Sequence, residues 1–169
     1  LCRHLDEAGA RLVVADLHQQ SVERAVKEFG ARPVAAEKIL GVEADILAPC
    51  ALGGILNART IPALKVKLVV GAANNQLATA ADGERLHGRG IVYAPDYVVN
   101  AGGIIAVAAE RESDVDTAEV MARIERIRER TREVLQIAQK SGRPSHEVAD
   151  ELAREIIRGA AKPMFRRVG

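Results

Sequence analysis

The amino-acid sequence predicts an α/β protein, in which a mostly parallel β-sheet is followed by a set of C-terminal helices. Two observations predict this class. Short runs rich in Val, Ile, Leu and Ala alternate with helical stretches over residues 1–110, an order typical of right-handed β–α–β units. Over residues 111–169 the clear patterns are helical. We therefore expect a sheet-containing domain at 1–110 and helices that pack on it at 111–169.

The first part of the chain reads as a helix, a strand, a second helix and an edge strand. Apolar residues recur at helical spacing in the first eight positions, and Gly9 stands where a helix C-cap belongs. The β-branched run RLVVAD (11–16) suits a strand buried on both faces. A helical stretch at 19–29 stops at Gly30, and the proline-containing run 31–35 suits an edge strand.

Three stronger strands follow. They are predicted in the runs ADILAPC (44–50), KLVVGAANN (67–75) and GIVYAPD (90–96). The clearest helix between them lies at 79–87. Strands that alternate with helices in this way favour a parallel sheet.

The C-terminal helices carry an apolar stripe and a charged, solvated face with i,i+4 pairs. The stripe runs through residues 116–142 and consists of Val120, Ile124, Ile127, Val134 and Ile137. Gly142 and Pro144 end this helix, and Ser145 is expected to cap the next one, at 145–159.

The composition excludes several classes of partner. The net charge of +1 and the 48% hydrophobic content favour a soluble globular protein and argue against nucleic acid or a membrane surface as a partner. No apolar run approaches the roughly 18–20 residues of a membrane span. Cys2 and Cys50 lack disulfide or metal spacing, which favours reduced thiols in the cytoplasm. We expect surface histidines and no metal site at His4, His18, His87 and His146.

Small or polar residues end each of the stronger strands. Asp16 ends the strand predicted at 11–16. The other three strands are followed by the segments 48–54, 71–75 and 94–103. In an open parallel sheet, ligands bind beyond the carboxyl ends of the strands. Four such endings in succession predict a ligand-binding edge.

Asp16 is the first candidate at this edge. A carboxylate at the end of the second strand of a dinucleotide-binding fold accepts hydrogen bonds from the adenosine ribose, and it repels a 2′-phosphate, so NAD is favoured over NADP. The alternative is that Asp16 only caps the helix that begins near residue 19. The glycine loop that precedes such an acid by about 20 residues would fall at or before Leu1. We therefore expect a fragment that begins inside a helix.

The fold expected from these features is a Rossmann-like, doubly wound, mostly parallel sheet that lacks its first strand and its glycine loop. That first strand is central in the order 3-2-1-4-5-6, so its loss separates two strands from the other three. We expect the fragment alone to be poorly stable for this reason.

Asn74 and Asn100 are the next candidates, because an amide offers both a donor and an acceptor to ribose hydroxyls, a carboxamide or a carboxylate. Asparagine is also a common turn former, but both residues follow strand ends on the same edge. Cys50 is expected to be a buried strand-end thiol rather than a nucleophile. Gly102 and Gly103 are expected to let the following helix pack closely against the cofactor or the sheet.

Four motifs in order, LCRHL…GA.LVVAD, APCALGG, GAANNQL and GIVYAPDYVVNAGG, resemble the cofactor domain of the glutamate, leucine, phenylalanine and valine dehydrogenase family. The resemblance covers residues 1–157 and is closest to the leucine dehydrogenase branch. It implies reversible NAD-dependent deamination of a branched-chain L-amino acid to its 2-oxo acid and ammonia by a homo-oligomer. A phenylalanine or other amino-acid dehydrogenase and a non-catalytic NAD-binding module remain the alternatives. A hydroxy-acid dehydrogenase would call for a catalytic histidine near the last strands, which this sequence does not offer.

The resemblance also implies site residues. Asp16 and Leu17 would hold the adenosine ribose, and the remaining cofactor contacts would come from Cys50, Ala51, Leu52, Ala72, Ala73, Asn74 and Asn100. The substrate would contact Asn74, Ile104 and Val107. The aliphatic side chains of Ile104 and Val107 favour a branched-chain substrate. The family's two active-site lysines and its aspartate have no counterpart in this chain. We therefore expect no catalytic residue in it, and no turnover by the fragment alone.

Overall fold

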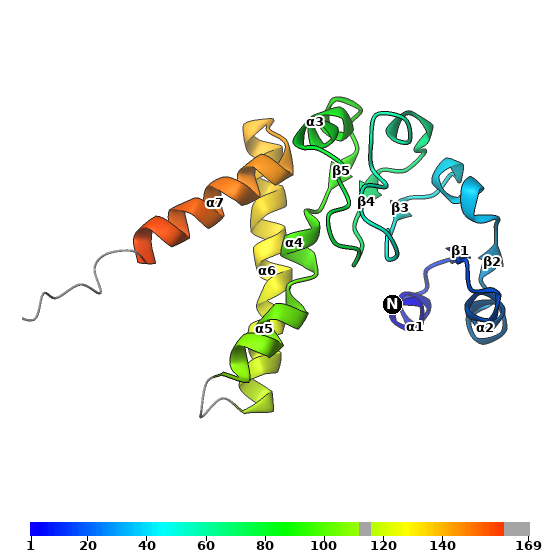
Figure 1. Ribbon diagram of the computed structural model, residues 1–169, viewed down its shortest axis with the longest axis horizontal. Helices are drawn as coiled ribbons and strands as arrows, with labels where there is room; N and C mark the ends of the chain where they lie inside the picture. Colours follow the sequence, from blue (N-terminus) through cyan, green and yellow to red (C-terminus); the bar gives the residue numbers. More distant parts are fainter. Residues whose placement is uncertain (112–115, 161–169) are drawn as a thin grey trace, which may run out of the picture. The chain divides into compact units, whose positions relative to one another are not determined.

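The computed structural model describes residues 1–111 and 116–160 (Figure 1). The parts of the predicted C-terminal helices at 112–115 and 161–169 lie outside the described residues. The chain is a mixed α/β protein with parallel strands, as the sequence predicts. It divides into two compact units, one formed by Leu1–Glu43 with Ala63–Lys65, and one formed by Ala44–Pro62 with the chain from Val66 onward. Each unit is described by itself.

The first unit begins with a helix and contains a two-stranded parallel sheet. Its elements in chain order are α1 (Cys2–Glu7), β1 (Val13–Val14), α2 (Gln19–Phe29), β2 (Arg32–Pro33) and the 3₁₀ helix η1 (Ala36–Gly41). Gly9 and Gly30 have φ angles of 79° and 60°, which confirms the predicted helix ends. The prediction that the first strand is buried on both faces is wrong. Val13 and Val14 are half-buried, because β1 pairs with β2 alone.

The second unit contains a three-stranded parallel sheet with the order β3-β4-β5 (Figure 1). The strands are β3 (Ile46–Leu47), β4 (Leu68–Val69) and β5 (Val92–Tyr93), with the 3₁₀ helix η2 (Ile61–Ala63) before β4 and helix α3 (Ala80–Gly88) before β5. Ile46, Leu68 and Val92 lie side by side in the register. The grouping of the strands into two and three is the one that the sequence predicts. Each ladder is shorter than the predicted run, since the rest of each run forms the loop after the strand.

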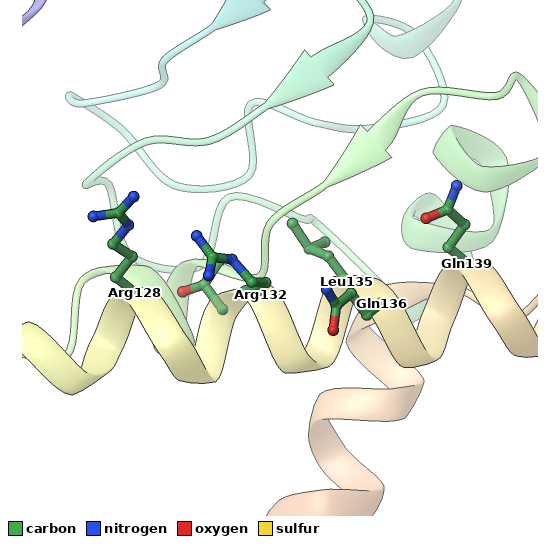
Figure 2. A pocket seen from close by; sticks show the side chains of 6 residues that line it. Arg128, Arg132, Leu135, Gln136 and Gln139 are labelled. Carbon is green, nitrogen blue, oxygen red and sulfur yellow. The ribbon is translucent and has the colours of Figure 1, made fainter.

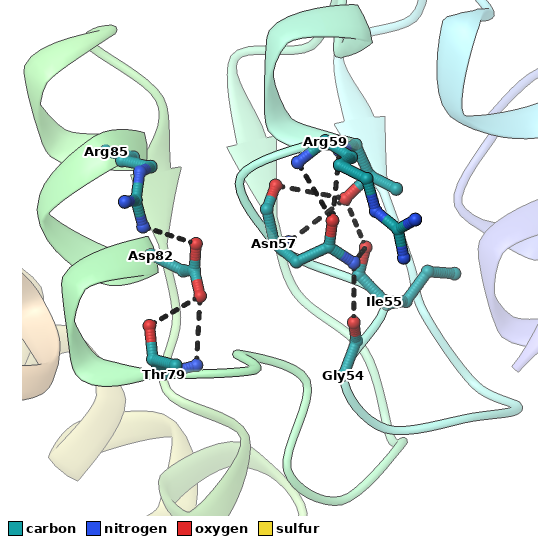
Figure 3. Close-up of polar contacts among 8 residues, drawn as sticks. Gly54, Ile55, Asn57, Arg59, Thr79, Asp82 and Arg85 are labelled. Carbon is teal, nitrogen blue, oxygen red and sulfur yellow. Dashed lines mark hydrogen bonds and ion pairs between the residues drawn. The ribbon is translucent and has the colours of Figure 1, made fainter.

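A buried carboxylate starts helix α3. Asp82 is 2% exposed, and its Oδ2 accepts hydrogen bonds from the Thr79 backbone nitrogen (2.9 Å) and the Thr79 hydroxyl (2.7 Å). Its other oxygen, Oδ1, accepts from Arg85 at 2.8 Å (Figure 3). This reciprocal cap satisfies donors that the first turn of a helix leaves free, so it fixes where α3 begins.

Four helices complete the second unit: α4 (Asp96–Val99), α5 (Gly102–Ala109), α6 (Thr117–Ser141) and α7 (Ser145–Ala160). The limits of α6 confirm the sequence prediction, because Asp116 caps its start and Gly142 ends it with a φ of 64°. The prediction that the apolar stripe is buried is confirmed at Val134, which is 1% exposed. It is wrong at Ile137, which is 36% exposed, while Ala138 is buried instead. The core between α6 and α7 consists of Val134, Ala138, Val148 and Ala149.

Two further predictions about α7 are wrong. Ser145 is the first residue of the helix rather than its cap, and its hydroxyl donates a hydrogen bond to the carbonyl of Tyr93. His146 is 8% exposed rather than a surface residue. Its ring lies so close to α3 that a Cβ on Gly83 would be 2.3 Å from it. Long-range packing of α7 against α3 and β5 decides both positions, and this packing leaves no local signal in the sequence.

The two glycines that open α5 make no close contact with the described chain, so packing against the sheet does not require them, while packing against a cofactor stays a prediction. A Cβ on Gly102 would make an ordinary contact of 3.9 Å with Ile124, and a Cβ on Gly103 would meet no atom within 4 Å. Among the described residues, no helix is both long enough and apolar enough to span a membrane.

Candidate functional site

The ends of β3, β4 and β5 meet at one edge of the sheet in the second unit, because the three strands are parallel and in register. The segments after β3 and β4 touch through their backbones. The Ala73 nitrogen donates to the Pro49 carbonyl at 3.0 Å. A Cβ on Gly71 would lie 2.1 Å from that same carbonyl oxygen, so only glycine fits at this position. The two strand ends are therefore held together by backbone alone.

A tight turn follows β4. Asn75 adopts a φ of 53°, a left-handed conformation that asparagine tolerates better than most residues. The Gly54 nitrogen donates to the Asn75 carbonyl at 2.7 Å, and a Cβ on Gly53 would lie 2.7 Å from the Asn74 carbonyl oxygen. The glycine pair after β3 thus lies directly against the Asn74–Asn75 turn.

One side chain shapes the loop that follows this glycine pair. Asn57 donates from Nδ2 to the Gly54 carbonyl at 2.9 Å, and its Oδ1 accepts from the backbone nitrogens of Arg59 (3.0 Å) and Thr60 (3.2 Å) (Figure 3). The Thr60 hydroxyl donates to the Ile55 carbonyl at 2.5 Å. These bonds, together with the backbone hydrogen bonds that join Leu56 to the segment 76–78, fix the loop and hold its glycines in place.

The structure brings the two predicted asparagines together. Asn100 donates from Nδ2 to Oδ1 of Asn74 at 2.6 Å, and the same nitrogen lies 3.4 Å from the Ala72 carbonyl oxygen. This bond uses a donor of Asn100 and the acceptor of Asn74. The Asn100 oxygen and the Asn74 nitrogen are the acceptor and the donor that the pair can offer a ligand, and a primary carboxamide carries one partner for each. Nicotinamide carries such a group.

A buried carboxylate that the sequence pattern does not single out is bonded to the residue after Asn74. Asp96 is 7% exposed, and its Oδ1 accepts from the Tyr93 hydroxyl at 2.5 Å. Its Oδ2 accepts from the Asn75 nitrogen at 2.8 Å. Burial, and then the hydrogen bond to Asp96, raises the pKa of the Tyr93 phenol above its ordinary value, so the hydroxyl stays a donor. The position of Asp96 directly after a strand end is the signal that could have found it.

Gln76 was missed as well. It is fully buried, and its Nε2 donates to the carbonyls of Gly71 (2.7 Å) and Ala73 (3.0 Å). Both carbonyls belong to the segment after β4. Gln76 therefore satisfies buried backbone acceptors that the short ladder leaves unpaired, and it keeps that segment in one shape.

The other predicted residues of this unit differ in exposure. Cys50, Ala51, Leu52 and Ala72 are exposed, whereas Ala73 is 5% exposed. The expectation that Cys50 is buried is wrong, because β3 ends at Leu47 and Cys50 lies in the loop beyond it. Ile104 and Val107, one turn apart on α5, are 68% and 49% exposed. The small exposed side chains leave the backbone of this edge accessible, which fits the approach of an extended ligand such as a dinucleotide.

Asp16 and Leu17 lie in the first unit, in the turn between β1 and α2. Oδ1 of Asp16 accepts a hydrogen bond from the His18 nitrogen at 2.8 Å, so one oxygen shapes the turn into the helix. The carboxylate is exposed, and Leu17 is 87% exposed. The turn role and the ribose role are compatible, because they use different lone pairs of the same group.

Two surface pockets lie on the helices of the second unit. One, of about 420 Å³, follows a single face of α6, from which the labelled side chains project in Figure 2; it is lined by Arg128, Thr131, Arg132, Leu135, Gln136 and Gln139. The other, of about 670 Å³, lies among α4, α5, α6 and α7. Neither is lined by the predicted site residues. Within residues 1–111 and 116–160, no three His, Cys, Asp or Glu side chains are grouped to hold a metal ion.

Comparisons with known proteins show the family of this chain. A family model described as Glutamate/Leucine/Phenylalanine/Valine dehydrogenase matches residues 6–168. Leucine dehydrogenase from Geobacillus stearothermophilus is 50% identical over 157 residues, which cover 93% of this chain and 42% of that protein. L-tryptophan dehydrogenase from Nostoc punctiforme is 40% identical over 162 residues, covering 93% and 44%.

A crystal structure of L-tryptophan dehydrogenase from Nostoc punctiforme superposes with a TM-score of 0.89 at 39% identity. That match covers 94% of this chain and 48% of the other chain. The chain thus spans less than half the length of the relatives that it matches.

Proposed function

The chain belongs to the glutamate, leucine, phenylalanine and valine dehydrogenase family, and on this basis we propose that the full-length protein is an NAD-dependent amino-acid dehydrogenase. The observation that supports the proposal is the hydrogen-bonded Asn74–Asn100 pair after β4 and β5, whose remaining donor and acceptor suit a carboxamide. The reaction is the reversible oxidative deamination of an L-amino acid to its 2-oxo acid and ammonia. NAD supplies the hydride acceptor, which amino-acid side chains lack.

The proposed roles follow the geometry. Residues 1–110 form a Rossmann-like NAD-binding part, and the described helices α6 and α7 contact it at α4 and β5. Asp16 and Leu17 hold the adenosine ribose, and the cofactor passes beside the exposed loops after β3 and β4, at Cys50, Ala51, Leu52, Ala72, Ala73 and Asn74. Asn74 and Asn100 orient the nicotinamide carboxamide and the reacting end of the substrate. We assign no acid–base catalyst to residues 1–169.

A branched-chain amino acid is the proposed substrate. Ile104 and Val107 present two exposed aliphatic side chains one turn apart on α5, and they suit a compact aliphatic group. Discrimination by apolar bulk is modest, at about 1–3 kcal/mol per methylene group. An aromatic substrate is therefore the competing possibility, as in the related tryptophan dehydrogenase. A cytoplasmic homo-oligomer is the proposed working form.

The substrate proposal is tested by initial rates of NADH formation with the full-length protein. We expect kcat/KM for L-leucine to exceed that for L-phenylalanine, L-tryptophan and L-glutamate by about tenfold or more, at least the effect of about one methylene group. NADP should replace NAD poorly, because Asp16 repels a 2′-phosphate. A higher kcat/KM for phenylalanine, tryptophan or glutamate would refute the branched-chain assignment.

A further inference from the structure

Asp96 forms hydrogen bonds with both of its carboxylate oxygens, although it lies in an interior where an ionised group is costly. One oxygen accepts from the Tyr93 hydroxyl on β5, and the other accepts from the Asn75 nitrogen in the turn after β4. The Tyr93 hydroxyl also accepts from the Asp96 nitrogen at 3.3 Å, so the tyrosine and the aspartate orient each other. Hydrogen bonds to a charged acceptor are the strong ones.

The bond to Asn75 acts on a strained position. The turn needs a φ of 53° at Asn75, and the carboxylate holds the nitrogen of that residue in place. The carbonyl of the same residue accepts from the Gly54 nitrogen at 2.7 Å, which ties the loop after β3 to the turn. The buried Asp96 carboxylate therefore bonds directly to Tyr93 on β5 and to the turn after β4. Through that turn it is connected to the loop after β3.

The neighbouring side chain depends on this turn. Asn74 precedes Asn75, and its Oδ1 receives the Asn100 amide at 2.6 Å. Any rotation of the turn would move Asn74 away from Asn100 and would lose the matched donor and acceptor. A shift of this kind far from the chemistry costs an enzyme a large factor in rate.

We propose that Asp96 is the positioning residue of the strand-end edge: it holds the Asn75 turn and thereby sets the mutual placement of the Asn74 and Asn100 amides. This inference rests on the proposed function for its effect on catalysis. Its effect on the turn is independent of that function. Asp96 does not touch the cofactor or the substrate in this account, so it acts through the two asparagines.

The test compares Asp96→Ala and Asp96→Asn in the full-length protein. Hydrogen–deuterium exchange is measured by mass spectrometry on peptides that contain Gly54 and Asn75. In Asp96→Ala we expect these peptides to exchange about tenfold faster or more, since a hydrogen bond to a charged group is lost. Peptides from α3 and α6 should exchange at the wild-type rate. Asparagine can still accept from the Asn75 nitrogen, so Asp96→Asn should restore most of the protection.

The kinetic readout separates positioning from catalysis. We expect kcat/KM for the amino acid to fall about 10- to 100-fold in Asp96→Ala, and to stay within about fivefold of wild type in Asp96→Asn. Val134→Ala is the matched control, because it opens the buried core between α6 and α7. It should leave both the exchange at Gly54 and Asn75 and kcat/KM within about twofold of wild type.

Tyr93→Phe is the second variant, in case Asp96→Ala does not fold. It removes one donor to Asp96, and we expect faster exchange in the same two peptides by about threefold or more. Wild-type protection of these peptides in Asp96→Ala or in Tyr93→Phe would overturn the proposal, and so would an equal rise in exchange in Val134→Ala. If the wild-type protein oxidises no amino acid, the proposed function fails, while the exchange result still decides the positioning role.

Discussion

Gly71→Ala is expected to destabilise the protein by about 3 kcal/mol or more, at the upper end of the range for overpacked interiors. The added Cβ would lie 2.1 Å from the Pro49 carbonyl oxygen and 2.5 Å from the Pro49 nitrogen. Both are backbone atoms, so no rotamer change relieves the overlap, and the ends of β3 and β4 must separate. The measurement is the urea midpoint of unfolding of the full-length protein.

Gly88→Ala is the matched control for this prediction. Gly88 is in the last turn of α3, and a Cβ there would meet no atom within 4 Å. Alanine should therefore leave the midpoint unchanged or raise the stability by up to about 1 kcal/mol. A Gly71→Ala protein with the wild-type midpoint would show that the two strand ends are not in contact as described.

Asn100→Ala is expected to have the largest effect on activity, a loss of about 100-fold or more in kcat/KM. The substitution removes the acceptor that Asn100 offers to a ligand, and it also frees Oδ1 of Asn74 from its 2.6 Å hydrogen bond. Asn100 is half-buried and does not belong to the core, so the unfolding midpoint should stay close to that of wild type. Initial rates with NAD and L-leucine measure the effect.

Gln139→Ala is the control, since it removes an exposed amide from α6. Its kcat/KM should equal that of wild type within about twofold. A loss of less than about threefold in Asn100→Ala would contradict the role assigned to the asparagine pair.

The features that the sequence predicts well are those with a local cause. Gly30 and Gly142 end helices because glycine adopts the left-handed conformation at low cost. The edge formed by the strand ends is also predictable, because parallel strands place their carboxyl ends together. Asn74 and Asn100 could be assigned to one place for this reason.

The features that the sequence does not predict depend on contacts between distant segments. Asp96 could not be joined to Asn75 without the register of β4 and β5. His146 has polar neighbours in the chain, yet it is buried against Gly83 because α7 packs on α3. Cys50 follows a strand but is exposed, because its ladder ends several residues earlier. In each case tertiary packing overrides the local pattern.

We expect the ends of β3, β4 and β5 to bind the nicotinamide end of NAD. The most direct test is a crystal structure of the full-length protein with NAD and the 2-oxo acid of leucine. We predict that the nicotinamide carboxamide lies within hydrogen-bond distance, about 2.7–3.2 Å, of the Asn74 or Asn100 side chain. Bound NAD whose nicotinamide lies out of hydrogen-bond reach of both side chains would contradict the claim.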